Sequence, residues 1–181
     1  MGNYSGSMVI SITGSPGTGK STACSKLSES GYSVTSVRKL AEQYNCIEEY
    51  DSAQDTYPID LNALRVKSDT SEYDFIDGHL SHLLKTDAVV ILRCKPEKLK
   101  TRLENRGYSQ KKIRSNLEWE YLSGITSELS QDTRPIIEID TTSSTISDVI
   151  NKILNFCEIV KTGKTDSMHA EIDWMNEPPN F

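Results

Sequence analysis

The chain has 181 residues, of which 20 are basic and 26 acidic, and its net charge is -6. This length fits one domain with a sizeable core, and the negative balance argues against a general affinity for nucleic acid, so no direct DNA binding is expected. Four scattered cysteines without a CxxC pair argue against a structural zinc site or a disulfide scaffold, so we expect a protein of the reducing cytoplasm. No apolar run is long enough to span a membrane.

The first chemical motif lies close to the amino terminus. Residues 1–7 lack the pattern of a signal peptide and are expected to be flexible. A short apolar segment then leads into Gly14-Ser-Pro-Gly-Thr-Gly-Lys-Ser21, which fits the P-loop pattern GxxxxGK[ST]. Backbone N–H groups of such a loop surround a polyphosphate, and a helix beginning near Gly19 points its positive end at the same anion. Lys20 is expected to reach the β- and γ-phosphates and Ser21 to bind Mg²⁺; the alternative is a Gly-Pro turn between a strand and a helix.

Short β-branched runs alternate with longer helical patterns along the chain. We predict strands at 9–13, 34–37, 75–77, 88–92 and 136–139, and helices at 20–30, 62–68, 96–106, 110–130 and 145–160. The alternation predicts an α/β three-layer sandwich around about five parallel strands, with the ligand site at the carboxyl ends of the strands. One domain is expected over residues 8–160.

Two segments do not fit this alternation. Residues 44–60 are polar, acidic and aromatic and follow the second strand, so a substrate-side insertion is predicted there. The tail at 161–181 is polar and contains Gly and two Pro, and we expect it to be poorly ordered. Within the tail, Ile172-Asp-Trp-Met175 forms an apolar island that we expect to dock on its own domain rather than on a partner.

A second motif, Phe75-Ile-Asp-Gly-His79, contains the third predicted strand. Asp77 would lie beside the P-loop at the carboxyl end of this strand, where it can hold Mg²⁺ directly or through water. The alternative is an N-cap for a helix starting near His79, and both roles can coexist. His79 and His82 would share a helical face, but no third metal ligand is apparent, so zinc binding is disfavoured. His79 either positions an attacking group or caps and packs.

The third motif is basic. Arg102 and Arg106 are four residues apart, so on a helix they would project from one face, away from Leu99 and Leu103. Phosphoryl transfer requires positioned cations that neutralise the developing charge. A solvated helix face is the alternative, but the preceding P-loop and the strand that ends in Asp77 favour the functional interpretation.

Together these motifs resemble the atypical adenylate kinases of the isoenzyme-six (CINAP) type, over about residues 8 to 160. The resemblance implies the nucleoside-monophosphate-kinase fold and phosphoryl transfer from ATP to AMP or related monophosphates, together with ATPase activity. It also implies a role in late maturation of the small ribosomal subunit, through transient contact with the ribosomal protein uS11. The segments that carry it are 14–22, Asp55-Thr-Tyr-Pro-Ile-Asp60, Asp77-Gly-His79, Leu92-Arg-Cys-Lys-Pro96 and Arg102-Leu-x-x-Arg-Gly-Tyr108.

The resemblance also assigns roles to individual positions. It places residues 37–60 in the monophosphate-binding region and 104–114 in the lid, from which Arg106 would contact ATP. The chain departs from the family before Leu40. The family has a Gly-Asp pair before the leucine that opens the monophosphate-binding region, whereas this chain has Arg38-Lys39, and this leaves the preferred acceptor open. The residues that would bind the ATP phosphates are Gly17, Gly19, Lys20, Ser21 and Thr22.

We therefore expect a Mg²⁺- and ATP-dependent nucleoside monophosphate kinase, with an ATP-driven assembly factor acting on a ribosomal protein as the alternative. A signalling GTPase is disfavoured, because guanine recognition usually rests on Asn-Lys-x-Asp. The sole Asn-Lys pair, Asn151-Lys152, continues Ile-Leu inside a predicted helix.

Overall fold

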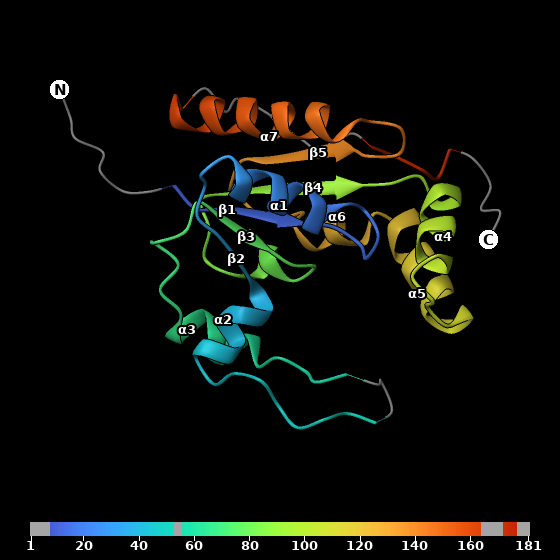
Figure 1. Ribbon diagram of the computed structural model, residues 1–181, viewed down its shortest axis with the longest axis horizontal. Coiled ribbons are helices and arrows are strands. Elements are labelled where there is room, and N and C mark those ends of the chain that lie inside the picture. Colours follow the sequence, from blue (N-terminus) through green and yellow to red (C-terminus); the bar gives the residue numbers. More distant parts are fainter. Residues whose placement is uncertain (1–7, 53–55, 164–171, 177–181) are drawn as a thin grey trace.

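The computed structural model describes residues 8–52, 56–163 and 172–176 (Figure 1). Residues 1–7, which are expected to be flexible, lie outside the described part, as do 53–55 and most of the tail beyond Gly163. The described strands form one sheet in the order β2-β3-β1-β4-β5, and every pairing in it is parallel. Their bounds are β1 (Ile10–Thr13), β2 (Val34–Ser36), β3 (Phe75–Asp77), β4 (Ala88–Arg93) and β5 (Ile136–Asp140).

Helices cover both faces of this sheet and produce the expected three-layer α/β arrangement (Figure 1). None of the described helices is both long and apolar enough to cross a lipid bilayer. The helices are α1 (Lys20–Glu29), α2 (Val37–Gln43), α3 (Leu61–Lys67), α4 (Pro96–Glu104), α5 (Gln110–Tyr121), α6 (Gly124–Glu128) and α7 (Ile146–Lys161), with a 3₁₀ turn η1 (Ser81–Leu83).

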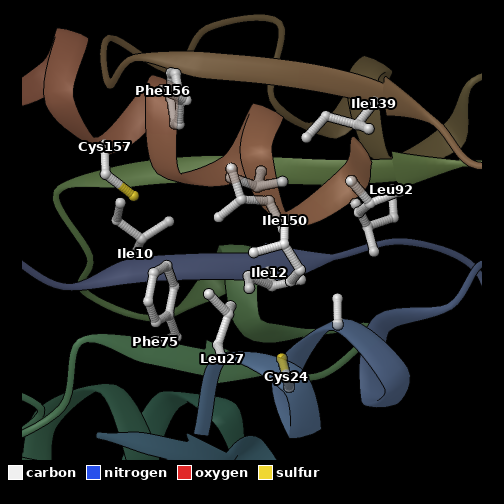
Figure 2. Close-up of a cluster of buried hydrophobic side chains, with 14 of the residues drawn as sticks. Ile10, Ile12, Cys24, Leu27, Phe75, Leu92, Ile139, Ile150, Phe156 and Cys157 are labelled. Carbon is white, nitrogen blue, oxygen red and sulfur yellow. The ribbon is translucent and has the colours of Figure 1, made fainter. Parts of the chain in front are cut away.

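The largest core cluster lies between the sheet and the pair α1 and α7 (Figure 2). Ile10 and Ile12 of β1 point to this face because side chains alternate along a strand. They meet Leu27 from α1 and Ile153 and Phe156 from α7, all of which are fully buried. The position of α1 directly behind β1 is fixed by this packing, so the loop between them is held from both ends.

The opposite face is covered in two places. Ile76 of β3 packs with Leu40 from α2 and Leu64 from α3, while Ile91 of β4 packs with Ile125 from α6. A further cluster joins α4 to α5 near the carboxyl edge of the sheet, through Leu99, Leu103, Ile113 and Leu117. The helix pair α4 and α5 therefore stands beside the end of the sheet at which the P-loop lies (Figure 1).

Three predictions of local structure are wrong. The predicted helix 110–130 is broken into α5 and α6, because Ser123 has φ 51 and a side chain at Gly124 would lie 2.2 Å from the ring of Trp119. The residue Val37 begins α2 rather than ending a strand, since the Ser36 side chain accepts a hydrogen bond from the N–H of Lys39 and caps the helix. No α-helix starts near His79; the chain makes only the 3₁₀ turn η1.

The predicted insertion at 44–60 leaves the body of the domain after α2 (Figure 1). Its two sides approach each other at the isolated antiparallel bridges Ile47↔Ile59 and Asp51↔Thr56. Near the far end, the rings of Tyr50 and Tyr57 lie 5.1 Å apart between centroids, and both side chains are half exposed. The segment is thus an extended ribbon that presents aromatic and acidic side chains to solvent.

Candidate nucleotide-binding site

The loop between β1 and α1 is shaped by its glycines. Gly14 has φ 146, and a Cβ atom there would lie 2.4 Å from the carbonyl oxygen of Leu92, so the loop is pressed against β4. Gly19, with φ 100, precedes α1 without a capping side chain, and the first turn of α1 contains no acidic residue. The N–H groups and the positive end of the α1 dipole therefore face the loop without a side-chain anion, as an anion-binding helix end requires.

Lys20 folds back over this loop. Its Nζ donates to the carbonyl oxygens of Gly14 at 2.7 Å and of Ser15 at 2.9 Å. Burial lowers the pKa of Lys20 to about 8, an effect that Asp77 opposes and Arg106 reinforces. Near neutral pH the ammonium is charged and stripped of much of its water, which strengthens its attraction for a phosphate.

Asp77 lies at the carboxyl end of β3, beside the loop. It pairs in register with Ile12 of β1, and its Oδ2 lies 3.5 Å from Oγ of Ser21. Its Oδ1 is the one buried side-chain oxygen or nitrogen without a hydrogen-bond partner among the described residues. Burial raises the pKa of Asp77, while Lys20 and the Ser21 hydroxyl act to lower it. A carboxylate with an unused oxygen next to a hydroxyl provides the oxygen ligands that Mg²⁺ prefers, so the residues present fit that ion.

The alternative role of Asp77 as a helix N-cap is wrong. The 3₁₀ turn η1 begins at Ser81, and the residue before it is Leu80, which makes no side-chain capping bond. The side chain of Asp77 is therefore directed to Ser21 and Lys20 rather than to a following helix.

The two histidines have different surroundings. His82 is buried and hydrogen-bonded at both ring nitrogens, to Thr13 at 2.9 Å and to Glu128 at 2.8 Å, so it connects the end of β1 to α6. His79 is exposed at the surface, although the protein around its ring and the charge of Lys20 lower its pKa. The two residues do not share a helical face, and no cluster of three or more His, Cys, Asp or Glu side chains occurs in the described parts of the chain.

The two arginines line one cavity of about 240 Å³ beside the loop. Arg102 lies on α4 and donates to the carbonyl oxygens of Gly17 at 3.2 Å and of Thr141 at 2.7 Å. Arg106 lies in the turn after α4, which ends at Glu104, so the predicted common helical face does not extend to it. The cavity also contacts Thr18, Thr22, Leu92, Ser144, Ile146 and Val149, among others.

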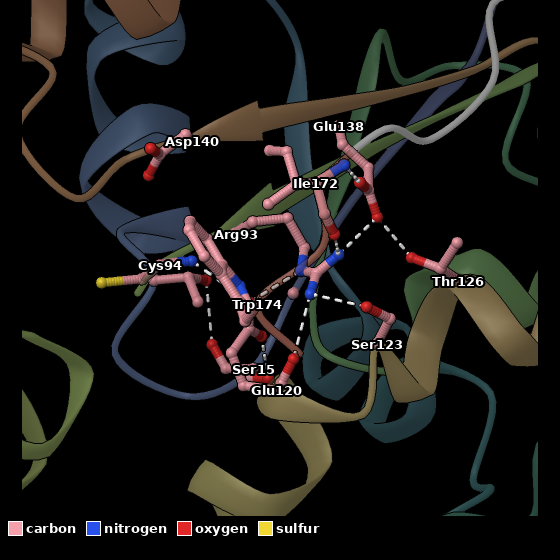
Figure 3. Close-up of polar contacts among 12 residues, drawn as sticks. Ser15, Arg93, Cys94, Glu120, Ser123, Thr126, Glu138, Asp140, Ile172 and Trp174 are labelled. Atoms are coloured by element: carbon pink, nitrogen blue, oxygen red, sulfur yellow. Dashed lines mark hydrogen bonds and ion pairs between the residues drawn. The ribbon is translucent and has the colours of Figure 1, made fainter. Parts of the chain in front are cut away.

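A buried ion cluster behind the loop was not predicted from the sequence (Figure 3). Arg93, at the end of β4, forms ion pairs with Glu120 at 2.7 Å and Glu138 at 2.6 Å, and all three side chains are 2% exposed. Burial alone would lower the pKa of Arg93, but the two carboxylates outweigh it and raise the pKa. The available signal was an arginine that ends an apolar strand, because a buried charge needs a partner. The sequence does not indicate that Glu120 and Glu138 are the partners of Arg93.

The expected docking of the apolar island in the tail is confirmed. The N–H of Ile172 donates to Glu138 at 2.8 Å, and its carbonyl oxygen accepts from Arg93 at 3.2 Å. The indole N–H of Trp174 donates to Glu120 at 3.3 Å, and its ring lies 6.0 Å from the Arg93 guanidinium carbon. Residues 172–176 are therefore part of the folded domain, and the prediction that the tail at 161–181 is poorly ordered is wrong for them.

The site combines four elements at the carboxyl edge of the sheet. A glycine-shaped loop and a helix end can bind phosphate groups, and Lys20 adds a buried positive charge. Asp77 and Ser21 supply oxygens for a divalent cation, and the adjacent cavity has apolar and polar walls suited to an organic group. This arrangement can bind a metal–polyphosphate ligand that carries a further chemical group.

Comparisons with known proteins agree with this geometry. A family model described as "AAA domain" matches residues 10–123. A protein named "Putative adenylate kinase" from Archaeoglobus fulgidus is 37% identical over 170 residues, covering 94% of this chain and 93% of its own. Proteins with the same name are 37% identical in Pyrococcus abyssi, covering 92% of this chain and 91% of theirs, and 34% identical in Methanocaldococcus jannaschii, covering 92% and 93%.

Solved structures show the same fold at low identity. A gluconokinase from Sinorhizobium meliloti 1021 superimposes with a TM-score of 0.56 at 16% identity, covering 87% of this chain and 96% of its own. A deoxyadenosine kinase from M. mycoides superimposes with a TM-score of 0.53 at 19% identity, covering 84% and 100%. These likenesses confirm the α/β P-loop fold.

Proposed function

Because the chain belongs to the family of adenylate kinase-like P-loop kinases, we propose that it is a nucleoside monophosphate kinase. It transfers the γ-phosphoryl group of ATP to AMP or to a related monophosphate. The observation that carries this proposal is the convergence of Lys20, Ser21 and Asp77 on one loop, next to a cavity lined by Arg102 and Arg106. The resemblance to the isoenzyme-six type is the narrower form of the same proposal.

The donor phosphates lie against the loop. Gly17, Gly19, Ser21 and Thr22 face them with backbone N–H groups at the start of α1, and Lys20 neutralises charge on the β- and γ-phosphates. Lys20 gives up its bonds to the Gly14 and Ser15 carbonyls to do so. The cavity of about 240 Å³ beside Thr22 and Ile146 takes the nucleoside of ATP.

Transfer is direct. The bond between the γ-phosphorus and the β–γ bridging oxygen breaks while an oxygen of the acceptor phosphate bonds to the γ-phosphorus, and two nucleoside diphosphates result when ATP and a monophosphate react. The acceptor phosphate is already ionised, so no general base and no covalent enzyme intermediate are needed. Lys20 and Arg106 stabilise the charge on the transferring group.

The donor site also has residues for a divalent cation. Ser21 and Asp77 would hold this ion, directly or through water, and it would neutralise phosphate charge and fix the geometry of the phosphates. The unpartnered Oδ1 of Asp77 supports this assignment.

The acceptor lies on the side of the loop formed by β2 and β3. The carboxyl ends of these strands lead to α2 and to His79, and residues 37–60 form the monophosphate-binding region. His79 is predominantly neutral near pH 7 because its pKa is lowered, so it orients the acceptor by hydrogen bonding rather than by charge.

Residues 104–114 form the lid. They comprise the last residue of α4, the turn that carries Arg106, and the start of α5. The segment borders the cavity through Arg106, so its closure over ATP brings this charge to the phosphates and excludes water. ATPase activity is the outcome when water replaces the acceptor.

The test is incubation of the purified protein with Mg²⁺-ATP and each monophosphate in turn, with nucleoside diphosphate and free phosphate measured separately. Diphosphate formation is expected, strongest with one acceptor, and Lys20→Ala should lower its rate at least about 100-fold. Lys26→Ala is the matched control, because Lys26 lies on the same helix but is half exposed and paired with Glu29. Undiminished transfer by Lys20→Ala would refute the assignment.

A second candidate is an ATP-driven assembly factor that acts on the small-subunit ribosomal protein uS11, with incidental kinase activity. The ribbon at 44–60 favours it, because Glu48, Glu49 and the half-exposed Tyr50 and Tyr57 present a surface that suits a basic protein. Recovery of uS11 in one nucleotide state but not in another would support this candidate. Absence of binding with ATP, with ADP and without nucleotide would reject it.

A further inference from the structure

Ser15 connects the phosphate loop to helix α5. Its hydroxyl donates to Glu120 Oε2 at 2.6 Å, and both residues are buried (Figure 3). The carbonyl oxygen of the same Ser15 accepts hydrogen bonds from Lys20 Nζ and from the hydroxyl of Thr18, each at 2.9 Å. The orientation of Ser15 therefore sets one of the acceptors that hold Lys20 and Thr18 in the loop.

The other carboxylate oxygen of Glu120 has three donors. Oε1 accepts from Nε of Arg93 at 2.7 Å, from the backbone N–H of Cys94 at 3.2 Å and from the indole N–H of Trp174 at 3.3 Å. Arg93 is the last residue of β4 and Cys94 follows it, whereas Trp174 belongs to the carboxyl-terminal segment. Glu120 is thus fixed from both sides, and its remaining oxygen is aimed at the loop.

The carboxyl-terminal segment also holds the rest of the ion cluster. Ile172 bonds through its backbone to Glu138 and to Arg93, and the ring of Trp174 lies over the Arg93 guanidinium. The three charged side chains are 2% exposed with the segment in place. Charges so deeply buried depend on every partner, so removal of one donor changes how the others are arranged.

We propose that Glu120 is a positioning residue for the phosphate loop and that Trp174 makes the carboxyl-terminal segment a working part of the nucleotide site. The chain of contacts runs from Trp174 through Glu120 to Ser15, whose carbonyl oxygen also holds Thr18 in the loop, whereas the bond from Lys20 to that oxygen is released when ATP binds. This proposal deepens the proposed function, and the one part of that function on which it rests is the binding of ATP by the loop. A loop ordered in advance loses less conformational freedom when ATP binds, so loss of the Trp174 contact weakens binding without removing any group that touches ATP.

The first variant is Trp174→Phe, which keeps an aromatic ring over Arg93 and removes the N–H donor. Its dissociation constant for Mg²⁺-ATP, measured by calorimetry, should rise about threefold to tenfold, the range expected for the net contribution of one typical hydrogen bond. Met175→Ala is the matched control, because this neighbouring side chain is half exposed, and its affinity should be unchanged. Melting temperatures of both variants establish that binding is measured on folded protein.

A double-variant cycle separates positioning from general destabilisation. Ser15→Ala removes only the hydroxyl that reaches Glu120, and it should also weaken ATP binding. If both residues act through Glu120, the double variant will bind little worse than the weaker-binding single variant. Additive effects, or a Trp174→Phe affinity equal to that of the parent, would overturn the proposal.

Fluorescence supplies a second readout that does not depend on the Trp174 variant. The chain has two tryptophans, so Trp119→Phe leaves Trp174 as the sole one. Saturating Mg²⁺-ATP should shift or quench the emission of Trp174, because coupling between two sites is reciprocal. Unchanged emission while calorimetry records ATP binding would contradict the proposal.

The outcomes also distinguish this inference from the proposed function. If ATP binding depends on Trp174 but no monophosphate is phosphorylated, the inference stands and the kinase assignment fails. If the parent protein phosphorylates a monophosphate and Trp174→Phe binds ATP equally well, the kinase assignment stands and the inference fails. If the parent protein does not bind ATP, both fail.

Discussion

Arg102 donates from its guanidinium to the carbonyl oxygen of Gly17 at 3.2 Å, so helix α4 supports the loop between β1 and α1. The same side chain donates to the carbonyl oxygen of Thr141, which follows β5, at 2.7 Å. Arg102 therefore fixes the width of the cavity between the loop and the start of α7. Arg102, for which the sequence predicts a role in charge neutralisation, thus connects the loop to the segment after β5.

Replacement of Arg102 should weaken ATP binding more than it slows phosphoryl transfer. Arg102→Lys keeps the charge but loses the planar fork that reaches Gly17 and Thr141 together. We expect the KM for ATP to rise about tenfold with a smaller change in kcat, as steady-state kinetics at a saturating acceptor concentration would show. Arg65→Lys is the control, since Arg65 is exposed on α3 and lies outside the loop, the lid and the monophosphate-binding region. Equal effects of the two substitutions would contradict the bracing role.

The pH dependence of ATP binding should report the protonation state of Lys20. Its pKa is lowered to about 8 chiefly by burial, so the ammonium loses its proton in the free protein as the pH rises through this value. Affinity for Mg²⁺-ATP should therefore be constant near pH 7 and fall above about pH 8, as calorimetry in matched buffers would show. Affinity that stays constant up to pH 9.5 would show that Lys20 keeps its proton.

The same pKa makes a separate prediction for stability. The unfolded chain holds the Lys20 proton more tightly than the folded one, so burial of the charged ammonium opposes folding at neutral pH. This opposing contribution is complete below about pH 8 and is relieved as the pH rises from there towards the ordinary lysine value of 10.5. Chemical denaturation of Lys20→Met should accordingly show a gain over the parent protein at pH 7 that shrinks by pH 9.5. A gain that grows with pH would reverse the sign of this effect.

Asp77 is expected to lower the stability of the fold while it supports Mg²⁺-dependent ATP binding. Burial raises its pKa, so the folded protein holds the carboxyl proton more tightly than the unfolded chain does. Stability therefore falls as the pH rises from the ordinary value of 3.8 towards the raised pKa, and at pH 7 burial of Asp77 opposes folding. Asp77→Asn should therefore melt at the same temperature as the parent or higher, while the Mg²⁺-dependent increase in ATP affinity disappears. Asp74→Asn, just before β3, is the control, because Asp74 accepts from the Ser33 N–H and an amide oxygen can do the same. A marked fall in the melting temperature of Asp77→Asn alone would show that Asp77 is a structural residue.

Glycines with positive φ differ in how well they would tolerate a side chain. A Cβ at Gly14 would lie 2.4 Å from the Leu92 carbonyl oxygen, whereas one at Gly31, which also has positive φ, would meet nothing within 4 Å. Gly31→Ala should cost about 1–2 kcal/mol of stability through backbone strain and leave ATP binding intact. Gly14→Ala should abolish ATP binding, because the loop must leave β4. Thermal unfolding and calorimetry of the pair test this, and retained affinity in Gly14→Ala would contradict the close approach.

The strands and the loop could be predicted because their signals are local. The predicted strands at 9–13, 34–37, 75–77, 88–92 and 136–139 agree with β1 to β5 within one or two residues, since buried parallel strands are short β-branched runs. The P-loop pattern and the position of Asp77 at the end of β3 predicted that these residues lie together, as they do. These features depend on residues adjacent in the chain or on neighbouring strands of one sheet.

The remaining features depend on contacts between distant residues. The break between α5 and α6 arises where Gly124 packs against Trp119 and Ser123 accepts from Arg93, and neither contact has a periodic signal. The pairing of Arg93 with Glu120 and Glu138 likewise joins residues from β4, α5 and β5. The helix α2 was missed because its capping serine also ends the preceding strand.

The most direct test of the central claim follows the γ-phosphoryl group itself. ATP labelled in its γ-phosphate is mixed with Mg²⁺, unlabelled AMP and the protein, and the products are separated at early times. Direct transfer predicts that the label appears in the β-phosphate of ADP formed from AMP, and that little label is released as inorganic phosphate. Label that appears as inorganic phosphate, at a rate that AMP and other monophosphates do not change, would contradict the kinase assignment and identify an ATPase.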